Sequence, residues 1–425
     1  ALKKGRCALL QDCGMGKTLE QLSWAEQVHE HTGKPVLILA PLSVADQTVK
    51  EAKKFGLFCK RVRHMEELSN ICVTNYEMVE HFNLDVLGGI VLDESSILKN
   101  FSGKTKQLLV ERCAHIPYRL CCTATPSPND YTELGNHAEF LGVMSRSEML
   151  STFFVHDGGD TSKWRLKGHA KQAFFGWVAS WACSMTSPAD LGYSSVGYTL
   201  PPLRIHECVV RADELEDESG QTLLFAQNRQ TLSQRRSSRR NSLKTRCEKA
   251  AQIANADSSQ CVLWCDLNDE SAELSRLVAD AVEVKGSNTN EEKSQRIVSF
   301  SEGYRKCLIS KPSIAGWGMN WQQCHRMIFV GLSDSFEAYY QAVRRCWRFG
   351  QKNPVDVYIV ISDAEGAVKE NLERKQQEAQ EMTYELVKHT KEILKVEIKS
   401  TCRMIEQYIA PEKMELPNWL KGEVA

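Results

Sequence analysis

A glycine-rich segment near the start of the chain contains the residue types that bind nucleotide phosphates. It runs from Gln11 to Thr18 as Gln-Asp-Cys-Gly-Met-Gly-Lys-Thr. Glycines let the backbone curl until its N–H groups point at phosphate oxygens, a lysine reaches the outer phosphates, and a threonine hydroxyl binds Mg²⁺. Gln11 stands where the generic pattern has glycine. The residues predicted to bind phosphate are Gly14, Met15, Gly16, Lys17 and Thr18.

A pair of carboxylates follows a short apolar run later in the chain. Ile90-Val91-Leu92 is typical of a buried strand, and Asp93 and Glu94 come directly after it. Asp93 can hold Mg²⁺ together with Thr18, and Glu94 can orient or deprotonate an attacking water. A lone pair of this kind is often only a solvated strand end. Its position after the phosphate loop, with other strands in between, favours the catalytic interpretation.

An arginine-rich segment from Gln341 to Gln351 supplies the opposite charge. On a helix, Gln341, Arg345 and Arg348 lie at i, i+4 and i+7, which is one face. The planar guanidinium fork suits phosphate oxygens, and arginines of a second lobe can reach the outer phosphate across a cleft. We therefore predict catalytic roles for Gln341, Arg345 and Arg348. The alternative is a solvated basic helix.

The elements around these segments alternate between short apolar runs and helical stretches. Such runs between helices favour parallel sheets covered on both faces, that is, an α/β fold. The pattern occurs twice, which indicates two α/β units with an insertion between them and a helical tail. The predicted boundaries are 1–142 for the first unit, 143–205 for the insertion, 206–365 for the second unit and 366–425 for the tail.

Three further regions have two or more interpretations each. Trp164, Trp177 and Trp181 of the insertion either pack its core or stack on bases, and the first is favoured. The arginine cluster from Arg235 to Arg240 either contacts phosphates or is a solvated helix face. The tail, with lysines among apolar positions, either docks on a lobe, binds a partner or presents a solvated face.

The composition is that of an ordinary soluble globular protein, with 42% hydrophobic and 25% charged residues. The net charge is -1, so contacts with nucleic acid require local basic patches. The sequence contains no apolar run of about 18 residues and no visible signal peptide, which indicates neither a membrane span nor secretion. The 16 cysteines include no Cys-x-x-Cys pair, which favours free thiols in a reducing cytoplasm over a zinc site.

The order of these segments resembles that of superfamily-2 helicases of the Swi/Snf type. Besides the segments above, the similarity includes Thr123-Ala124-Thr125-Pro126 and Ala315-Gly316-Trp317-Gly318-Met319-Asn320. It also includes Leu39-Ala40-Pro41-Leu42, Thr74-Asn75-Tyr76-Glu77 and Leu98-Lys99-Asn100. Together the segments cover most of residues 1–361, so the resemblance is far more specific than any single motif.

The resemblance implies two RecA-like lobes that hydrolyse ATP with Mg²⁺ between them and move along double-stranded DNA. It places Gly318 at the nucleotide. It also implies nucleic-acid contacts by Pro41, Asn75, Tyr76, Lys311 and Ser313. An RNA helicase or a restriction-complex motor subunit is the alternative within the same class, and a non-hydrolysing nucleic-acid-binding scaffold is the alternative from another class. A protein partner is expected to bind through the insertion or the tail.

Four departures from the family pattern bear on these expectations. Ser95-Ser96 replaces Ala-His, so coupling between the motifs is expected to be wired differently, and Ala124 replaces a glycine. The glutamine that contacts adenine in this family would precede residue 1, which leaves base selectivity open. The insertion, with Lys163 to His169 and Pro188 to Tyr193, resembles helicases of bacteria and phages, which implies a cytoplasmic location in such a cell.

Overall fold

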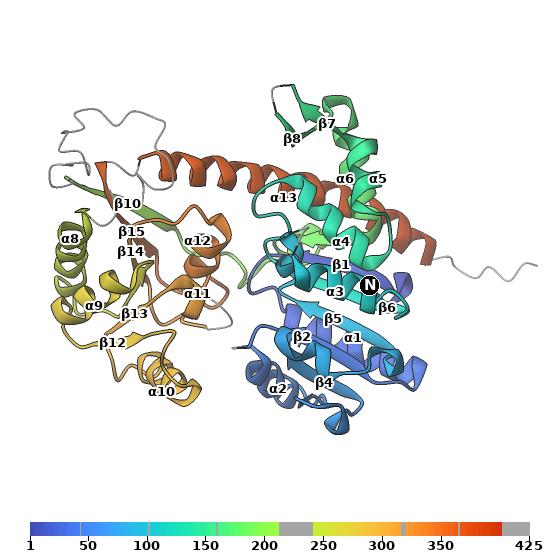
Figure 1. The fold of residues 1–425 in the computed structure, drawn as a ribbon, viewed down its shortest axis with the longest axis horizontal. Helices are drawn as coiled ribbons and strands as arrows, with labels where there is room; N and C mark the ends of the chain where they lie inside the picture. The colour runs from blue at the N-terminus through green and yellow to red at the C-terminus, as the bar shows by residue number, and fades with distance from the viewer. Residues whose placement is uncertain are drawn as a thin grey trace, which may run out of the picture.

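The computed structural model describes residues 1–42, 44–100, 103–158, 160–211, 241–315, 320–363 and 366–401. Two parallel sheets lie side by side, one in each half of the molecule (Figure 1). The predicted pair of α/β units is therefore confirmed. We call the half that contains the phosphate loop lobe 1 and the other half lobe 2.

The lobe 1 sheet has seven strands in the order β3-β4-β2-β5-β6-β1-β9, and the lobe 2 sheet has six in the order β10-β15-β14-β11-β13-β12. The lobe 1 strands are β1 (Arg6–Gln11), β2 (Val36–Ala40), β3 (Lys60–Arg61), β4 (Ile71–Asn75), β5 (Gly89–Asp93), β6 (Tyr118–Thr123) and β9 (Ala182–Met185). The lobe 2 strands are β10 (Leu203–Val210), β11 (Cys261–Cys265), β12 (Ala281–Val284), β13 (Cys307–Ser310), β14 (Arg326–Val330) and β15 (Val355–Ser362).

The parallel register determines where the chemistry-bearing residues lie. Leu10 of β1 is paired with Thr123 of β6, and Asp93 of β5 is paired with Cys122. The carboxyl ends of β1, β5 and β6 therefore meet at one edge of the sheet, the usual place for ligands of open α/β sheets. This edge carries the phosphate loop, the carboxylate pair and the Thr-Ala-Thr-Pro segment.

Helices cover both faces of each sheet because the strands are apolar on both sides. On lobe 1, α1 (Lys17–Thr32) and α2 (Ala45–Lys54) cover one face, and α3 (Lys104–Arg112) and α4 (Leu134–Leu141) cover the other. On lobe 2, α8 (Leu243–Asn255) and α9 (Asn268–Leu277) cover one face, and α10 (Asn290–Ser301), α11 (Pro312–Ala315) and α12 (Phe336–Val343) cover the other. Short 3₁₀ helices are η1 (Leu2–Lys4), η2 (Met65–Glu67), η3 (Tyr76–His81), η4 (Leu84–Val86), η5 (Ser95–Lys99), η6 (Tyr131–Glu133), η7 (Gly168–Ala170) and η8 (Pro188–Leu191).

The insertion forms a projection from lobe 1. It consists of α5 (Arg146–Phe153), the antiparallel hairpin of β7 (Phe154–Asp157) and β8 (Asp160–Leu166), and α6 (Lys171–Trp181) (Figure 1). Trp177 lies 5.4 Å between ring centroids from both Phe153 and Trp181, and Trp164 packs against the same core. The prediction that these tryptophans pack the insertion is confirmed.

The predicted insertion range 143–205 is divided differently in the structure. Its four residues Ala182–Met185 form β9, which pairs with β1 as the edge strand of the lobe 1 sheet. The strand is short and contains Cys183 and Ser184, so no apolar run marks it in the sequence. The last residues of the range begin β10, the edge strand of lobe 2.

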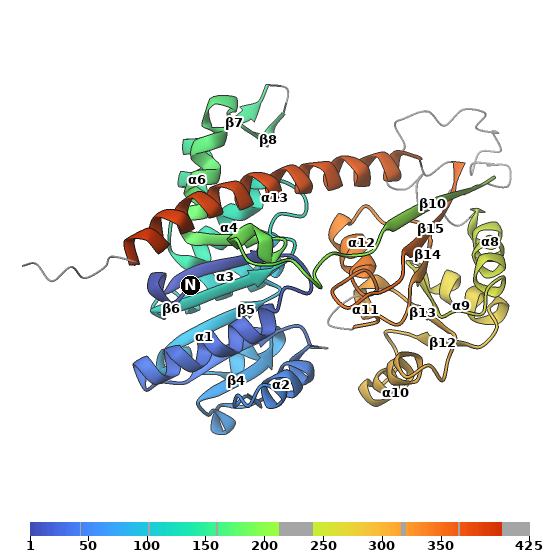
Figure 2. The same ribbon diagram turned by 180° about the vertical axis from the view of Figure 1, so that it is seen from behind.

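The tail forms one helix, α13 (Gly366–Thr401), which crosses from lobe 2 to lobe 1 (Figure 2). Val368 and Leu372 are buried in the lobe 2 core, whereas Met382 and Leu386 are buried in the lobe 1 core. The Thr390 hydroxyl accepts a hydrogen bond from the Ser184 backbone at 3.2 Å. Docking on a lobe is therefore the alternative that the structure supports for the tail.

The sequence predictions also concern membrane-spanning helices, metal sites and the arginine cluster. The described helices include none that is long and apolar enough to cross a membrane. The cysteines within the described ranges are free thiols, and no group of three His, Cys, Asp or Glu side chains there could hold a metal ion. The cluster from Arg235 to Arg240 lies outside the described residues.

Candidate active site between the two lobes

The phosphate loop leads from β1 into α1. Gly14 has φ 86° and Gly16 has φ 92°, a backbone region that side chains rarely adopt. The Lys17 ammonium donates to the backbone oxygens of Gln11 at 2.9 Å and Asp12 at 3.0 Å. The loop thus curls around its own lysine, which lies where it can exchange these carbonyls for phosphate oxygens. Met15 and Thr18 are half-buried on the same loop and first turn.

Gly14 also lies close to lobe 2. A Cβ placed on Gly14 would lie 3.2 Å from Cβ of Phe349, in the arginine-rich segment of lobe 2. That separation is tighter than ordinary van der Waals contact, so a side chain at this position would push the lobes apart.

Asp93 is fixed from two sides at the end of β5. Gln21 of α1 donates its amide to Asp93 Oδ1 at 2.7 Å, and the Tyr76 hydroxyl donates to the Asp93 backbone oxygen at 2.7 Å. Burial raises the pKa of the Asp93 carboxyl, whereas the Gln21 hydrogen bond and the Lys17 charge lower it. Gln21 was not predicted, although it lies one helical turn after Lys17 on the same face of α1.

Glu94 is held in a left-handed conformation, with φ 55° and ψ 55°. Strain of this kind in a non-glycine residue concentrates at functional sites. Its Oε2 atom is buried and has no hydrogen-bond partner within the described part of the chain. Burial raises the pKa of Glu94 to about 7; the Asp93 and Glu337 charges add to the rise, and those of Lys17 and Arg345 oppose it. The free oxygen is an acceptor available to a water molecule.

These residues fit a nucleotide with Mg²⁺. Magnesium is usually held by one or two carboxylates together with substrate phosphates rather than by an all-protein cage. Asp93 supplies one carboxylate beside the phosphate loop, and Thr18 supplies a hydroxyl in the first turn of α1. Lys17 can bind the phosphates, and the Glu94 Oε2 atom, which has no hydrogen-bond partner in the described structure, can bind a water.

The arginine-rich segment approaches this site from lobe 2. Arg345 donates from Nε to the Gln341 backbone oxygen at 2.9 Å and from Nη2 to the Gln341 side chain at 2.7 Å. Gln341 and Arg345 are buried, and the Arg345 charge is close enough to act on Glu94. Burial and the neighbouring Arg345 charge lower the pKa of Arg348 to about 10. The structure therefore brings Arg345 to the predicted carboxylates. The prediction of one helix face is wrong, because α12 ends at Val343 and Arg345 and Arg348 lie in the turns that follow it.

Arg344 makes a direct contact between the lobes that the sequence did not reveal. Its Nη2 atom lies 2.6 Å from Asp12 Oδ2 and 3.0 Å from the Cys13 backbone oxygen. The Tyr340 hydroxyl also bonds to Asp12, and the guanidinium lies 5.0 Å from the Trp347 ring centroid. The signal in the sequence is the second arginine beside Arg345, at the end of α12.

Ser95, the first of the two serines after Glu94, has a partner of its own. The Ser95 hydroxyl lies 3.1 Å from Nε2 of His137 on α4. Burial lowers the pKa of His137 to about 4, so the ring is neutral at pH 7. The link from this segment to Thr125 runs instead through Glu337 of lobe 2, which binds both Lys99 and the Thr125 hydroxyl. The expected difference in wiring from the family stays a prediction.

The predicted nucleic-acid contacts are placed unevenly. Asn75 is paired in register with Ala40, next to Pro41, and both candidates are half-buried at the carboxyl edge of lobe 1. Lys311 and Ser313 follow β13 at the corresponding edge of lobe 2. The prediction for Tyr76 is wrong. Its side chain is buried, and its hydroxyl donates a hydrogen bond to the Asp93 backbone oxygen in the active site.

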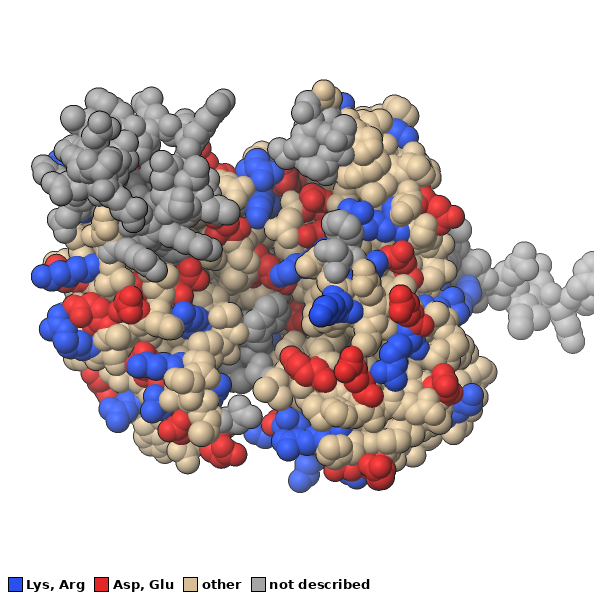
Figure 3. All heavy atoms as spheres, in the orientation of Figure 1, with Lys and Arg blue, Asp and Glu red and all other residues tan. Residues whose placement is uncertain are grey.

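Gly318 lies outside the described residues, so its predicted contact with the nucleotide has no structural account. Figure 3 shows Lys and Arg side chains interspersed with Asp and Glu over one face of the molecule. This pattern agrees with the net charge of -1 and indicates local rather than broad basic contacts.

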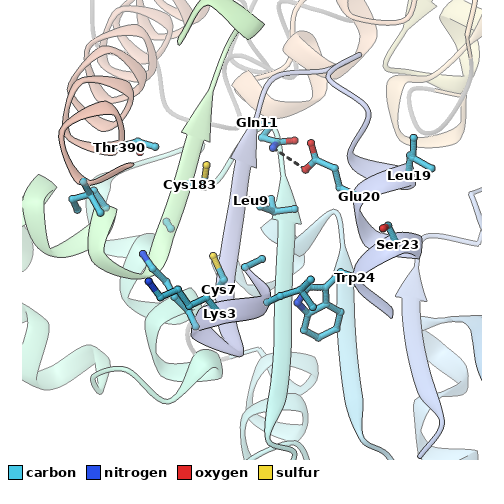
Figure 4. Close-up of a pocket in the computed structure, with 16 residues that line it drawn as sticks. Lys3, Cys7, Leu9, Gln11, Leu19, Glu20, Ser23, Trp24, Cys183 and Thr390 are labelled. Carbon is cyan, nitrogen blue, oxygen red and sulfur yellow. Dashed lines mark hydrogen bonds between the residues drawn. The ribbon is translucent and has the colours of Figure 1, made fainter. Parts of the chain in front are cut away.

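A cavity of about 620 Å³ opens beside the phosphate loop (Figure 4). It lies between α1 and α13, and residues of β1 and β9 form part of its wall. Gln11, Leu19 and Glu20 line the end nearest the loop, and Gln11 donates its amide to Glu20 at 2.8 Å. Its size is within the range of small-ligand pockets, and most of its walls are apolar.

Comparison with known proteins gives one match for each lobe. Residues 3–154 match the family model of the SNF2-related domain, and residues 242–350 match that of the helicase conserved C-terminal domain. The first range lies within lobe 1 and the second within lobe 2, and the strands β9, β10 and β15 lie outside both.

Individual relatives are similar over about a third of the chain. A probable chromatin-remodeling complex ATPase chain of Oryza sativa subsp. japonica is 28% identical over 173 residues, 35% of this chain and 15% of the relative. The ISWI chromatin-remodeling complex ATPase CHR17 of Arabidopsis thaliana is 30% identical over 173 residues, 35% of this chain and 16% of the relative. The DEAD-box ATP-dependent RNA helicase 56 of Oryza sativa subsp. japonica is 27% identical over 124 residues, 28% of each chain.

The matched segment is thus about a sixth of the length of the two remodeling ATPases. These relatives are eukaryotic and give no support to the expected relation to bacterial or phage helicases, which stays a prediction. The two domain matches and the geometry between the lobes agree on the class of enzyme. The chain has the two domains of a superfamily-2 helicase of the Snf2 type, a class of ATP-hydrolysing helicases and translocases.

Proposed function

We propose that this protein is an ATP-dependent translocase that moves along double-stranded DNA. The observation that carries the proposal is the convergence of Lys17, Glu94 and Arg345, from two lobes, on one buried site. A site split in this way is complete only when the lobes are together, so each round of hydrolysis can be coupled to a lobe movement.

The residues have separate tasks at this site. Lys17 binds the outer phosphates in place of the Gln11 and Asp12 carbonyls, and Asp93 with Thr18 holds Mg²⁺. MgATP supplies the phosphoanhydride bond whose hydrolysis provides the free energy. Glu94 accepts a hydrogen bond from the attacking water on Oε2 and takes up its proton, and Arg345 and Arg348 balance the negative charge that develops.

The cavity beside the loop is the candidate binding site for the nucleoside. Leu19 and Glu20, which line it, directly follow Thr18, so a base and ribose attached to loop-bound phosphates have apolar walls within reach. The Gln11–Glu20 pair at the near end offers hydrogen-bonding groups to the base. We propose that this pair determines which base is bound.

Double-stranded DNA is proposed as the track because two relatives named above are chromatin-remodeling ATPases. Pro41 and Asn75 of lobe 1 and Lys311 and Ser313 of lobe 2 are the candidate contacts. Contacts of this kind go mainly to phosphates, so binding is expected to be weakly sequence-specific and to weaken with salt.

An RNA track is the second candidate, favoured by the similarity to a DEAD-box RNA helicase. A restriction-complex motor and a non-hydrolysing scaffold are the remaining alternatives, and the intact Lys17, Asp93 and Glu94 argue against a scaffold. A cytoplasmic location in a bacterial or phage-infected cell is proposed on the sequence resemblance alone.

A triplex-displacement assay tests the proposal. A third strand bound to linear duplex DNA is followed as ATP is added. We expect the wild-type protein to displace the third strand, and Glu94→Gln to bind ATP and DNA without displacing it. Unwinding of RNA duplexes without any displacement of the third strand would contradict the proposed track.

A further inference from the structure

A single carboxylate of lobe 2 reaches two segments of lobe 1. Glu337 lies in the first turn of α12 and is 3% exposed. One of its oxygens forms an ion pair with Lys99, at the end of η5, and the other accepts a hydrogen bond from the Thr125 hydroxyl at 3.3 Å. Lys99 follows the Asp93–Glu94 turn, and Thr125 follows β6. The carboxylate therefore joins the two segments that lead away from the active-site strands.

Glu337 can contact Lys99 and Thr125 across the interface only while the two lobes are together. A buried carboxylate is costly unless it is paired and hydrogen-bonded. If the lobes separate, Glu337 loses both Lys99 and Thr125, and the side chain must be rehydrated. The contact thus stabilises the closed arrangement and no other.

Glu337 also contributes to the orientation of α12. It lies seven residues, or two helical turns, before Arg344, which binds Asp12 at the other end of the helix. Two attachments on one helix define its direction over lobe 1. The direction matters because Gln341 and Arg345 lie between or beside these attachments and point into the active site.

We propose that Glu337 is a positioning residue for ATP hydrolysis, which couples closure of the lobes to the placement of Arg345 through its contacts with Lys99 and Thr125. The inference rests on the proposed function above. Glu337 contacts no residue of the phosphate loop in the described structure. Its loss is therefore expected to reduce turnover while nucleotide binding persists.

A charge swap between Glu337 and Lys99 tests the proposal. Glu337→Lys and Lys99→Glu are each expected to lower DNA-stimulated kcat by roughly 30- to 100-fold, and the double variant to recover it to within about tenfold of wild type. Binding of a fluorescent ATP analogue is expected to stay within about threefold in all three variants. The matched control is Lys369→Glu, which breaks an exposed ion pair to Glu207 within lobe 2 and is expected to leave kcat unchanged.

Glu337→Gln covers the case in which a charge reversal disturbs folding. It keeps the side-chain shape and an acceptor for Thr125, so a normal melting temperature is expected together with about a tenfold lower kcat. Wild-type turnover in Glu337→Gln would overturn the proposal, as would a double variant no better than the single ones. A wild-type protein that binds the ATP analogue but never hydrolyses ATP would instead overturn the proposed function, and this inference with it.

Discussion

The contact between Arg344 and Asp12 predicts how strongly the lobes are held together. The perturbation is Arg344→Met, which keeps the length and apolar stem of the side chain and removes the guanidinium. Arg344 is buried, and its Nη2 atom makes the 2.6 Å bond to Asp12 and the 3.0 Å bond to the Cys13 carbonyl. Both hydrogen bonds connect lobe 2 to the phosphate loop of lobe 1.

The magnitude follows from these two bonds. Hydrogen bonds that involve a charged group contribute about 1.5 to 3 kcal/mol each. We take the lower end because the Asp12 side chain is 21% exposed and regains hydration when the pair breaks. Two bonds at about 1.5 kcal/mol give about 3 kcal/mol, or roughly a hundredfold change in the ratio of closed to open lobes.

The assay is energy transfer between dyes on the two lobes in the absence of nucleotide. Phe58 in lobe 1 and Tyr304 in lobe 2 are exposed and can be replaced by residues that carry the dyes. Because α13 continues to connect the lobes, we expect Arg344→Met to open the interface by rotation and to add a low-transfer population. The matched control is Arg374→Met, which removes an exposed arginine paired with Glu378 within α13.

An unchanged distribution of distances in Arg344→Met would refute this reasoning. It would mean that α13 and the Glu337 contact hold the lobes without help from Arg344. A shift of the same size in Arg374→Met would show that the dyes report on α13 rather than on the interface.

Three further predictions concern binding, pH and stability. Lys17→Ala is expected to weaken ATP binding by at least a hundredfold, which titration with a fluorescent ATP analogue measures. The melting temperature is expected to stay unchanged, because the free protein loses only the two described hydrogen bonds from Lys17 to loop carbonyls. Glu94 must be ionised to accept a proton, and burial raises its pKa to about 7, so kcat is expected to fall roughly tenfold from pH 8 to pH 6. Bound Mg²⁺ is expected to move this fall to lower pH. A kcat profile at saturating ATP that stays flat to pH 5 contradicts the role of Glu94 as base. Glu270→Ala removes the buried carboxylate that pairs with Arg246 at 2.8 Å and is expected to destabilise lobe 2 by about 3 to 5 kcal/mol in urea unfolding. A loss under about 1 kcal/mol would contradict the importance of the pair.

The sequence is informative about the fold and the lobe 1 half of the site for a physical reason. Buried parallel strands are continuous apolar runs. Asp93 and Glu94 directly follow one such run, and the phosphate loop with Lys17 follows another, so the motif and the strand identify each other. The phosphate loop also requires glycines at fixed positions, and the structure confirms the left-handed backbone at Gly14 and Gly16.

Contacts across the lobes were not predictable in the same way. Arg344 and Arg345 are adjacent and chemically alike, and only the rotation of α12 over lobe 1 decides which one binds Asp12. Glu337 resembles any acidic residue in the first turn of a helix, a place where such residues are common. Their roles depend on the relative placement of two sheets, which no local pattern encodes.

Tyr76 and β9 show two other limits. The resemblance placed Tyr76 at the nucleic acid, but its ring is buried and its hydroxyl supports Asp93, since a strand-end residue can turn inward as easily as outward. The β9 strand is defined by its pairing with β1 and not by its own composition. Both features are set by tertiary contacts.

We propose that ATP is hydrolysed between the two lobes in response to double-stranded DNA. The most direct measurement is the steady-state ATP turnover of the wild-type protein alone and with saturating duplex DNA, single-stranded DNA or RNA. Turnover that rises at least tenfold with duplex DNA and less with the other two is the result we predict, with loss of the rise in Arg345→Ala. Turnover that is unaffected by duplex DNA, or that persists in Arg345→Ala, would contradict the account.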